Sequence, residues 1–251
     1  MTSTRVMGLL ICGALILAAT PAAAQRPAPF ERGYAHLNFG VQGTSSDVNQ
    51  DSTFPVYDEA ARLQTTGTTG HGALFDVGGG MRVWQRLYAG LSFTTGSNTE
   101  DAPLTASIPH PFFFDQPRTV TGTASGLKHS QQAVHLQAMW RIPVTTAFDI
   151  SIGGGPTFFS VKQDMVTGIT FSEVGDPTTG VTLTGVTVER VSDNPVGFHL
   201  QADGTYLLTR RFGVGGFLRY AGGNADLESA DNTLDIDVGG FQIGVGGRVR
   251  F

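Results

Sequence analysis

Acidic, basic and imidazole side chains recur at alternate positions of this chain, with apolar residues between them. Each such segment therefore has one polar face and one apolar face. Acids and bases that share a confined space are expected to pair, because an unpaired buried charge costs on the order of several kcal/mol. The residues on the polar faces are Asp76, Arg82, His135, Asp149, His199, Asp203, Arg219, Arg248 and Arg250.

The sequence offers few residues whose types and spacing could form a catalytic site. His129 and Ser130 are neighbours on an expected strand, so their side chains point to opposite faces and are badly placed as base and nucleophile. His110 stands in a loop without a sequence partner. Metal-ligand spacings, phosphate-binding loops and nucleophile elbows do not occur. The sequence therefore predicts no enzyme, no cofactor and no metal site.

The composition differs from that of a typical soluble domain. Among 251 residues only 15% are charged, and 34 are glycine. Soluble domains usually contain about 25% charged residues. The net charge of −5 argues against a nucleic-acid partner, which would require a basic face.

The N-terminus has the features of an export signal. Arg5 precedes a short apolar run that ends in small residues at Ala24, which predicts a signal peptide over 1–24. An uncleaved anchor helix is disfavoured because the run is short for a membrane span. Cys12 is the only cysteine, so the remaining chain offers no disulfide. A short periplasmic leader is expected at 25–32, followed by one folded domain at 33–251.

Eight segments alternate with period two and are predicted to be strands. Short turns are expected at 84–86, 142–146 and 209–211, and long connections at 44–71, 98–126, 163–195 and 223–237. Parts of 163–195 still look like strand, so a raised hairpin there would give ten strands instead of eight. The eight predicted strands are 33–42, 75–83, 87–94, 134–141, 148–158, 196–208, 212–220 and 241–251.

Short and long connections alternate strictly, which is typical of an antiparallel up-and-down β-barrel that crosses an outer membrane. A soluble barrel of the lipocalin type also has eight strands. That barrel would place its apolar side chains inside and its charges outside. Faces rich in Asp, Arg, His and Gln cannot line a dry pocket, so the sequence favours apolar side chains facing lipid and polar ones facing the lumen.

The closing segment carries the most specific resemblance. Gly244, Val245, Val249 and the aromatic Phe251 alternate up to the C-terminus. In this respect, and over about 33–251, the chain resembles the small eight-stranded outer-membrane barrels of the OmpA, OmpX and OmpW type. The resemblance implies that these four residues form an insertion signal read by the barrel-assembly machinery, and that the closing strand pairs with 33–42.

Aromatic residues gather beside the predicted short turns, where an interfacial girdle is expected. The residues concerned are Trp140, Phe148, Tyr206 and Phe212. Ordinary strand propensity of aromatic residues is the alternative explanation.

The interior of an eight-stranded barrel is just wide enough to be filled by side chains. We therefore expect the inward ionisable residues to form an ion-pair plug; a narrow or gated pore is the alternative. Phe112, Phe113 and Phe114 form an apolar patch in the second long loop. This patch could pack over the barrel mouth or bind a surface partner.

The sequence thus predicts a monomeric outer-membrane protein with a structural or surface-interaction role. A small transporter of hydrophobic molecules is the second hypothesis, and a lipid-modifying enzyme the third. The expected partners are outer-membrane lipid and lipopolysaccharide, the assembly machinery and an unidentified surface ligand.

Overall fold

The computed structural model describes residues 31–43, 46–69, 72–174, 180–229 and 232–251. The expected signal peptide at 1–24 lies outside these ranges, as do residues 25–30 of the expected leader. The described part of the chain contains no helix long and apolar enough to cross a bilayer.

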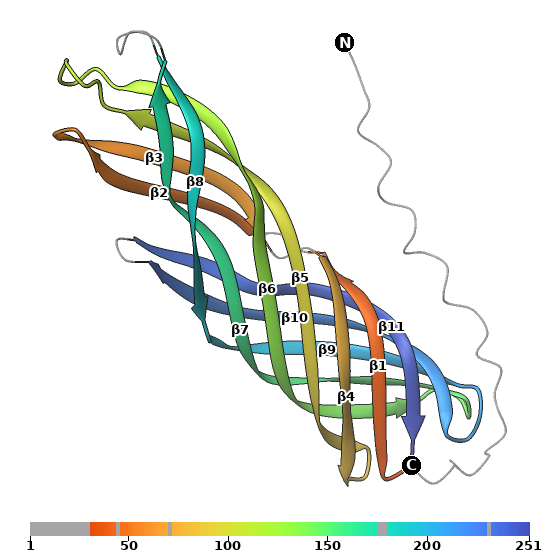
Figure 1. Cartoon of the computed structure of the whole chain (residues 1–251). Coiled ribbons are helices and arrows are strands. Elements are labelled where there is room, and N and C mark those ends of the chain that lie inside the picture. Colours follow the sequence, from red (N-terminus) through yellow and green to blue (C-terminus); the bar gives the residue numbers. More distant parts are fainter. Residues whose placement is uncertain (1–30, 44–45, 70–71, 175–179, 230–231) are drawn as a thin grey trace, which may run out of the picture.

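Eight antiparallel strands form a closed ring (Figure 1). Consecutive ring strands pair with one another, and β1 closes the ring on β11, where Phe39 pairs with Val245. The expected up-and-down barrel, including its closing pair, is confirmed. The ring strands are β1 (Gly33–Gln42), β4 (Gly72–Trp84), β5 (Leu87–Ile108), β6 (Arg118–Pro143), β7 (Phe148–Glu173), β9 (Val196–Leu207), β10 (Phe212–Ser229) and β11 (Asn232–Arg250).

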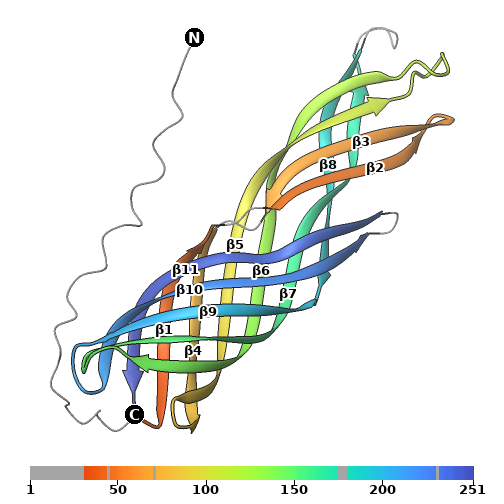
Figure 2. The same cartoon turned by 180° about the vertical axis from the view of Figure 1, so that it is seen from behind.

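An extension of the same sheet continues beyond the long-loop end of the ring (Figures 1 and 2). It contains the hairpin β2 (Ser46–Val56) and β3 (Glu59–Thr69), which joins the upper part of β5. On the other side, β8 (Val181–Asp193) pairs with the upper part of β7. The strand order β2-β3-β5-β6-β7-β8 follows from these pairings.

The long connections are present, but those at 44–71, 98–126 and 223–237 are largely strand, which the sequence did not predict. The raised hairpin within 163–195 is present. The missed strands are rich in Thr, Ser and Gln, and their buried residues include small ones such as Ala61 and Ala106. A strand of this composition shows only weak hydrophobic alternation. The extension has an apolar core of its own, which includes Leu63, Leu104 and Ile108.

Side chains of the ring strands alternate between lumen and exterior, as the pleat of a strand requires. The exposed side includes Phe39, Leu136, Ile152 and Val245, while polar residues such as Gln137 and Ser151 are buried inside. This apolar exterior is much larger than a soluble monomer tolerates. The ring therefore has the surface of a membrane-spanning barrel.

Gly246 allows the closing pair to approach closely, and Gly246→Ala should weaken it. A Cβ there would lie 1.8 Å from the backbone oxygen of Leu37 and 2.7 Å from Cα of Asn38. Overpacking of this kind costs about 1–3 kcal/mol, so the urea midpoint of the detergent-solubilised barrel should fall. Gly247→Ala is the matched control, since its Cβ would meet nothing within 4 Å. Equal midpoints for the two variants would contradict the expectation.

Candidate functional site

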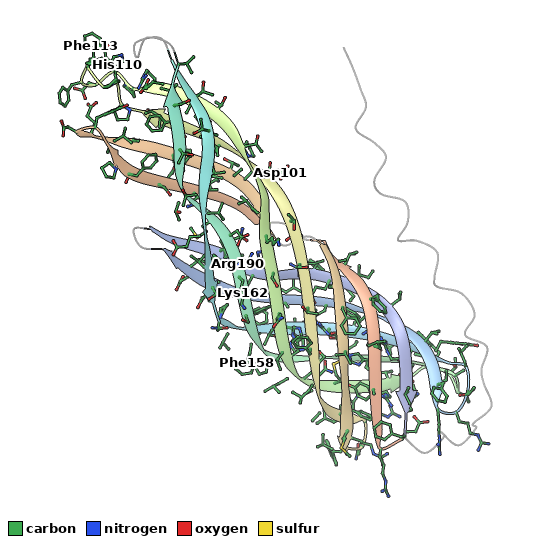
Figure 3. All side chains as sticks on the ribbon, in the orientation of Figure 1. Asp101, His110, Phe113, Phe158, Lys162 and Arg190 are labelled. Carbon is green, nitrogen blue, oxygen red and sulfur yellow. The ribbon has the colours of Figure 1, made fainter. Side chains whose placement is uncertain are left out.

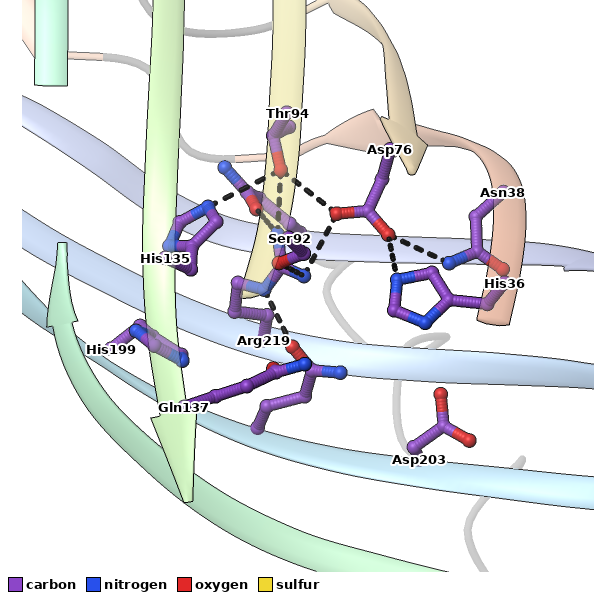
Figure 4. Close-up of polar contacts among 12 residues, drawn as sticks. His36, Asn38, Asp76, Ser92, Thr94, His135, Gln137, His199, Asp203 and Arg219 are labelled. Carbon is purple, nitrogen blue, oxygen red and sulfur yellow. Dashed lines mark hydrogen bonds and ion pairs between the residues drawn. The ribbon is translucent and has the colours of Figure 1, made fainter. Parts of the chain in front are cut away.

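The centre of the lumen is occupied by Arg219 of β10 and Asp76 of β4 (Figure 4). Both side chains are 0% exposed, and Arg219 Nη2 donates to Asp76 Oδ2 at 2.9 Å. The same guanidinium donates to Thr94 Oγ1 at 2.7 Å and to Gln201 Oε1 at 2.7 Å. Four ring strands, β4, β5, β9 and β10, are thereby joined across the lumen.

Both carboxylate oxygens of Asp76 have hydrogen-bond partners. Its Oδ1 accepts a hydrogen bond from Asn38 Nδ2 at 2.8 Å and lies 3.0 Å from His36 Nε2. Its Oδ2 also accepts from the Thr94 hydroxyl at 2.9 Å. A buried carboxylate that pairs with an arginine and accepts several hydrogen bonds is stable as an anion.

A row of imidazoles and hydroxyls lies beside this pair. His135 contacts Thr157 Oγ1 through Nδ1 at 2.9 Å and Thr94 Oγ1 through Nε2 at 3.2 Å. Thr157 Oγ1 is also 2.9 Å from His199 Nδ1, and the two imidazole ring centres are 4.8 Å apart. These groups extend the polar network from β5 to β6, β7 and β9.

A second layer of charges lies nearer the short turns. Arg248 Nη2 donates to Asp203 Oδ2 at 2.7 Å, and Arg250 donates to Asp149. Arg141 donates to Tyr88 OH at 3.1 Å and stacks over the Tyr88 ring. Because the closing strand supplies both Arg248 and Arg250, this layer links the end of the chain to the rest of the barrel.

Most of the predicted inward residues are thus brought together, but Arg82 is not. It is exposed, and among the described residues no ion pair joins it to the network. The pairing of β1 with β4 ends at Met81, and a bulge between Arg82 and Trp84 leads into the turn. Arg82 therefore lies past the rim of the lumen.

Sequence reasoning did not single out several members of the network. These residues stand at strand positions whose side chains point into the lumen, but they are neutral or aromatic. Only their position in the alternation of the strand could have identified them from the sequence. They are Tyr34, His36, Asn38, Tyr88, Thr94, Gln201 and Gln242.

The space that remains in the lumen is small. A cavity of about 30 Å³ lies on the long-loop side of the central pair, between Thr94, Gln131 and Gln242. A cavity of about 20 Å³ lies on the other side, near His36 and Arg248. A cavity needs roughly 10–15 Å³ to hold one water molecule, so each of these two cavities has room for about one to three waters.

Above the polar network the lumen becomes apolar. Phe159, Val161 and Met165 of β7 pack with residues of β10 and β11 that include Leu227 and Val238. The upper halves of β10 and β11 thus supply apolar inward side chains, and some of them, such as Leu227, come from the stretch 223–237 that the sequence predicted to be a long connection.

The predicted apolar patch lies at the far end of this extension of the sheet. Phe112, Phe113 and Phe114 are 67%, 51% and 70% exposed at the tip of the β5–β6 hairpin. Figure 3 shows Phe113 and His110 at that tip, far from Phe158 on the barrel wall. The patch does not pack over the barrel mouth, because β5 and β6 continue outward as strands and carry it away.

Hydrogen bonds hold the tip in place. The Asp115 backbone N–H donates to Glu59 Oε1 at 2.9 Å, which ties the β5–β6 tip to the β2–β3 tip. Glu173 accepts from Arg118 and, at 2.9 Å, from Tyr57 OH. The hydrogen bonds from Arg118 hold the pKa of the Glu173 carboxyl below its ordinary value.

This depressed pKa predicts a pH dependence of tip stability. Because the pKa of Glu173 is lower in the folded chain, its contribution is fully present above the ordinary pKa of 4.5 and is lost as the pH falls through the folded value. The pair is partly exposed, so the effect should stay below about 1 kcal/mol. Hydrogen exchange of the backbone amides of residues 109–117, corrected for intrinsic rates, should show lower protection at about pH 3 than at neutral pH. Glu173→Gln should remove this difference; an unchanged difference would contradict the assignment.

The residues predicted for the membrane boundary face outward. Trp140, Tyr206 and Phe212 are exposed and Phe148 is half-buried, all beside the short turns. In the closing strand Val245, Val249 and Phe251 are exposed, whereas a Cβ on Gly244 would point at the Phe217 ring in the lumen. The predicted insertion residues thus occupy both faces of β11.

The residues first considered for catalysis lie apart. His129 is buried and its Nδ1 lies 2.6 Å from Gln163 Oε1, while Ser130 is half-buried on the opposite face of β6. His110 packs against the Phe113 ring at 4.9 Å on the tip.

Several solved structures are similar to this chain. Neisserial surface protein A is 11% identical with a TM-score of 0.47, and the match covers 87% of this chain and 97% of that chain. OprG from Pseudomonas aeruginosa is 8% identical with a TM-score of 0.47, covering 88% and 96%. The outer membrane protease OmpT from Escherichia coli is 8% identical with a TM-score of 0.46, covering 88% and 97%.

No curated protein matches this sequence. The model of one family, described as the outer membrane protein beta-barrel domain, matches residues 10–248. The match covers almost the whole chain, and its description agrees with the closed ring and the apolar exterior. This protein is a member of the outer membrane protein beta-barrel domain family and resides in the bacterial outer membrane.

Proposed function

We propose that this protein is a closed, non-enzymatic barrel that holds a rigid extracellular sheet against a surface partner. The observation that carries the proposal is the tip, where Phe112, Phe113 and Phe114 are exposed at the end of a sheet with its own core. Exposed apolar patches on folded proteins usually mark interaction sites.

The rigidity of the extension supports an interaction role. The Asp115–Glu59 and Arg118–Glu173 contacts order the tip before any partner arrives, which reduces the entropy lost on binding. Two acidic residues lie at the tip with the patch, Asp115 directly after Phe114 and Glu59, which accepts the hydrogen bond from the Asp115 N–H; Asp58 precedes Glu59 in the chain. The matching partner would present an apolar pocket with a basic rim.

A transporter of hydrophobic molecules is the second candidate. The apolar cluster around Phe159 and Val161 in the upper lumen favours it. This cluster is packed, however, and the Arg219–Asp76 network lies beneath it. A closed barrel agrees better with both observations.

The tip can be tested with a probe that has the expected chemistry. Vesicles carrying the wild-type barrel should adhere to an immobilised peptide of alternating leucine and lysine. Serine at positions 112, 113 and 114 should reduce retention by about tenfold, because buried aromatic anchors dominate interface energy. The control is Val174→Ser with Val188→Ser, two exposed positions on the side of the extension. Equal retention of the triple variant and wild type would refute the role of the tip.

A further inference from the structure

The only two lysines of the chain are neighbours on its outer wall. Lys128 lies on β6 and Lys162 on β7, and both side chains are exposed. Ser130 is directly opposite Lys162, so Lys128, two residues away along β6, is the diagonal neighbour of Lys162. Diagonal neighbours are about 7–8 Å apart, within reach of long side chains. The two ammonium groups can therefore contact one ligand.

Arg190 of β8 is the third cation of this group. It is directly opposite Asp164, which lies two residues beyond Lys162 on β7. Its Nε donates to Asp164 Oδ1 at 2.7 Å and its Nη2 to Asp164 Oδ2 at 3.0 Å. The same Oδ2 accepts the Lys128 backbone N–H at 3.0 Å. The carboxylate thus fixes the guanidinium and occupies only two of its three nitrogens. Together with Asp164, the three cations form what we call the lysine patch.

The lysine patch is positively charged and surrounded by hydroxyls. In the part of the chain that the structure describes, neither lysine ammonium has an ion-pair or hydrogen-bond partner. Three cations and one carboxylate give the patch a net charge of +2. The strand positions level with Lys162 are serines, namely Ser97 on β5, Ser130 on β6 and Ser192 on β8.

The height of the lysine patch is that of lipid headgroups. Val134, Phe158 and Val196 pair in one exposed apolar row, and the outward positions of β6 and β7 between this row and the patch are polar. Lys162 follows Phe158 by four residues, which is about 13 Å along a strand and about 10 Å in height for the tilt of a barrel strand. Figure 3 shows Lys162 and Arg190 between Phe158 and the extension. Lysine side chains at such a level extend toward the headgroups.

A phosphate monoester matches the lysine patch in charge and in hydrogen bonding. It carries about −1.5 to −2 charges at neutral pH, close to the opposite of the patch. Ammonium and guanidinium groups donate strong hydrogen bonds to phosphate oxygens, and serine hydroxyls can donate to those that remain. The net charge of the whole chain is −5, so the attraction of an anion would be local to this patch.

We infer that the lysine patch binds the phosphate monoester of an outer-leaflet lipid headgroup. Lys128 and Lys162 contact the phosphate from two neighbouring strands, and Arg190 donates to it from the third. The hydrocarbon chains of the lipid run down the apolar row below the patch into the membrane. The inference is independent of the role proposed for the tip.

The test uses the two lysines as reporters, because the chain has no others. The full barrel, labelled with carbon-13 at the lysine ε-carbons, is placed in phosphatidylcholine nanodiscs with increasing fractions of phosphatidic acid, a phosphate monoester. Both ε-carbon NMR signals should shift saturably. Phosphatidylglycerol, a phosphodiester, should shift them much less at twice the fraction, which gives the bilayer at least the same charge. Inorganic phosphate added to discs of phosphatidylcholine alone should leave both signals in place.

Each lysine can be replaced while the other reports. Lys128→Gln, observed at Lys162, and Lys162→Gln, observed at Lys128, should each raise the half-saturating fraction of phosphatidic acid by about tenfold, or 1.4 kcal/mol. Arg62→Gln is the matched control, because Arg62 is an exposed cation on β3, opposite Ser107 and away from the patch. It should leave the half-saturating fraction unchanged. Heat-modifiable gel migration reports whether each variant is folded.

Lysine signals that do not move with phosphatidic acid, or folded lysine variants that bind it as wild type does, would overturn the inference. Equal shifts with phosphatidylglycerol would also overturn it, because the lysines would then respond only to the charge of the bilayer. Saturable shifts with inorganic phosphate alone would overturn the assignment to a lipid.

Discussion

Replacing Arg219 by methionine should lower the free energy of unfolding by about 3–5 kcal/mol, the cost of leaving one member of a buried pair without its partner. Arg219 donates to Asp76, Thr94 and Gln201 from a position with no exposure to solvent. Methionine keeps much of the volume and removes the charge and every donor. The measurement is urea unfolding in detergent, followed by fluorescence of Trp84 and Trp140 on the barrel exterior.

A second substitution separates the ion pair from general packing. Asp76→Asn on the Arg219→Met background removes the orphaned charge, while the amide still fits beside Asn38 and Thr94. The double variant should recover more than half of the lost stability, because the unpaired buried charge causes most of the penalty. A double variant as unstable as Arg219→Met would show that packing, and not charge, dominates at this point.

The combined substitution Asp76→Ala with Arg219→Ala should convert a closed barrel into a conducting one. The central pair separates the two cavities of about 30 and 20 Å³, and both are lined by polar side chains. Truncating both side chains removes the material between the cavities, and because both partners of the pair are removed, neither is left as an unpaired buried charge. In planar bilayers wild type should show no steady channels, whereas the double variant should show discrete current steps well above background.

The control for conductance is Asp164→Ala with Arg190→Ala. This pair has a 2.7 Å contact outside the lumen, with the Arg190 side chain 53% exposed. Its loss should leave the bilayer current unchanged. Steady channels formed by wild type would refute the closed barrel. Absence of channels in the Asp76→Ala, Arg219→Ala variant would contradict the prediction. The barrier to ions would then be another part of the lumen, such as the apolar cluster around Phe159.

The sidedness of each barrel strand followed from the sequence alone. Trp140 faces outward and Arg141 inward because successive side chains of a strand point to opposite faces. The three short turns and the strict alternation of connections also specified the strand order of the ring. These are local properties, and each can be read within one or two neighbouring segments.

The extracellular sheet could not be predicted in the same way. β2 pairs with β3, and β3 pairs with the upper end of β5; the polar residues of both strands alternate with small ones. Their stability depends on Leu63 meeting Leu104 and Val166, residues far away in the sequence. Hydrophobic alternation measured along one segment does not report such contacts.

The sequence by itself determined the class of the fold, the closing strand and the polar character of the lumen, because a period of two defines two faces. Only the tertiary structure decided that Asp76 pairs with Arg219 and Asp203 with Arg248, while Arg82 lies past the rim. The height of a residue in a barrel depends on the tilt and stagger of every strand between it and its partner. Those quantities arise from closure of the whole ring, so the sequence predicted which face of each strand turns to the lumen, but neither the full membership of the network nor its pairing.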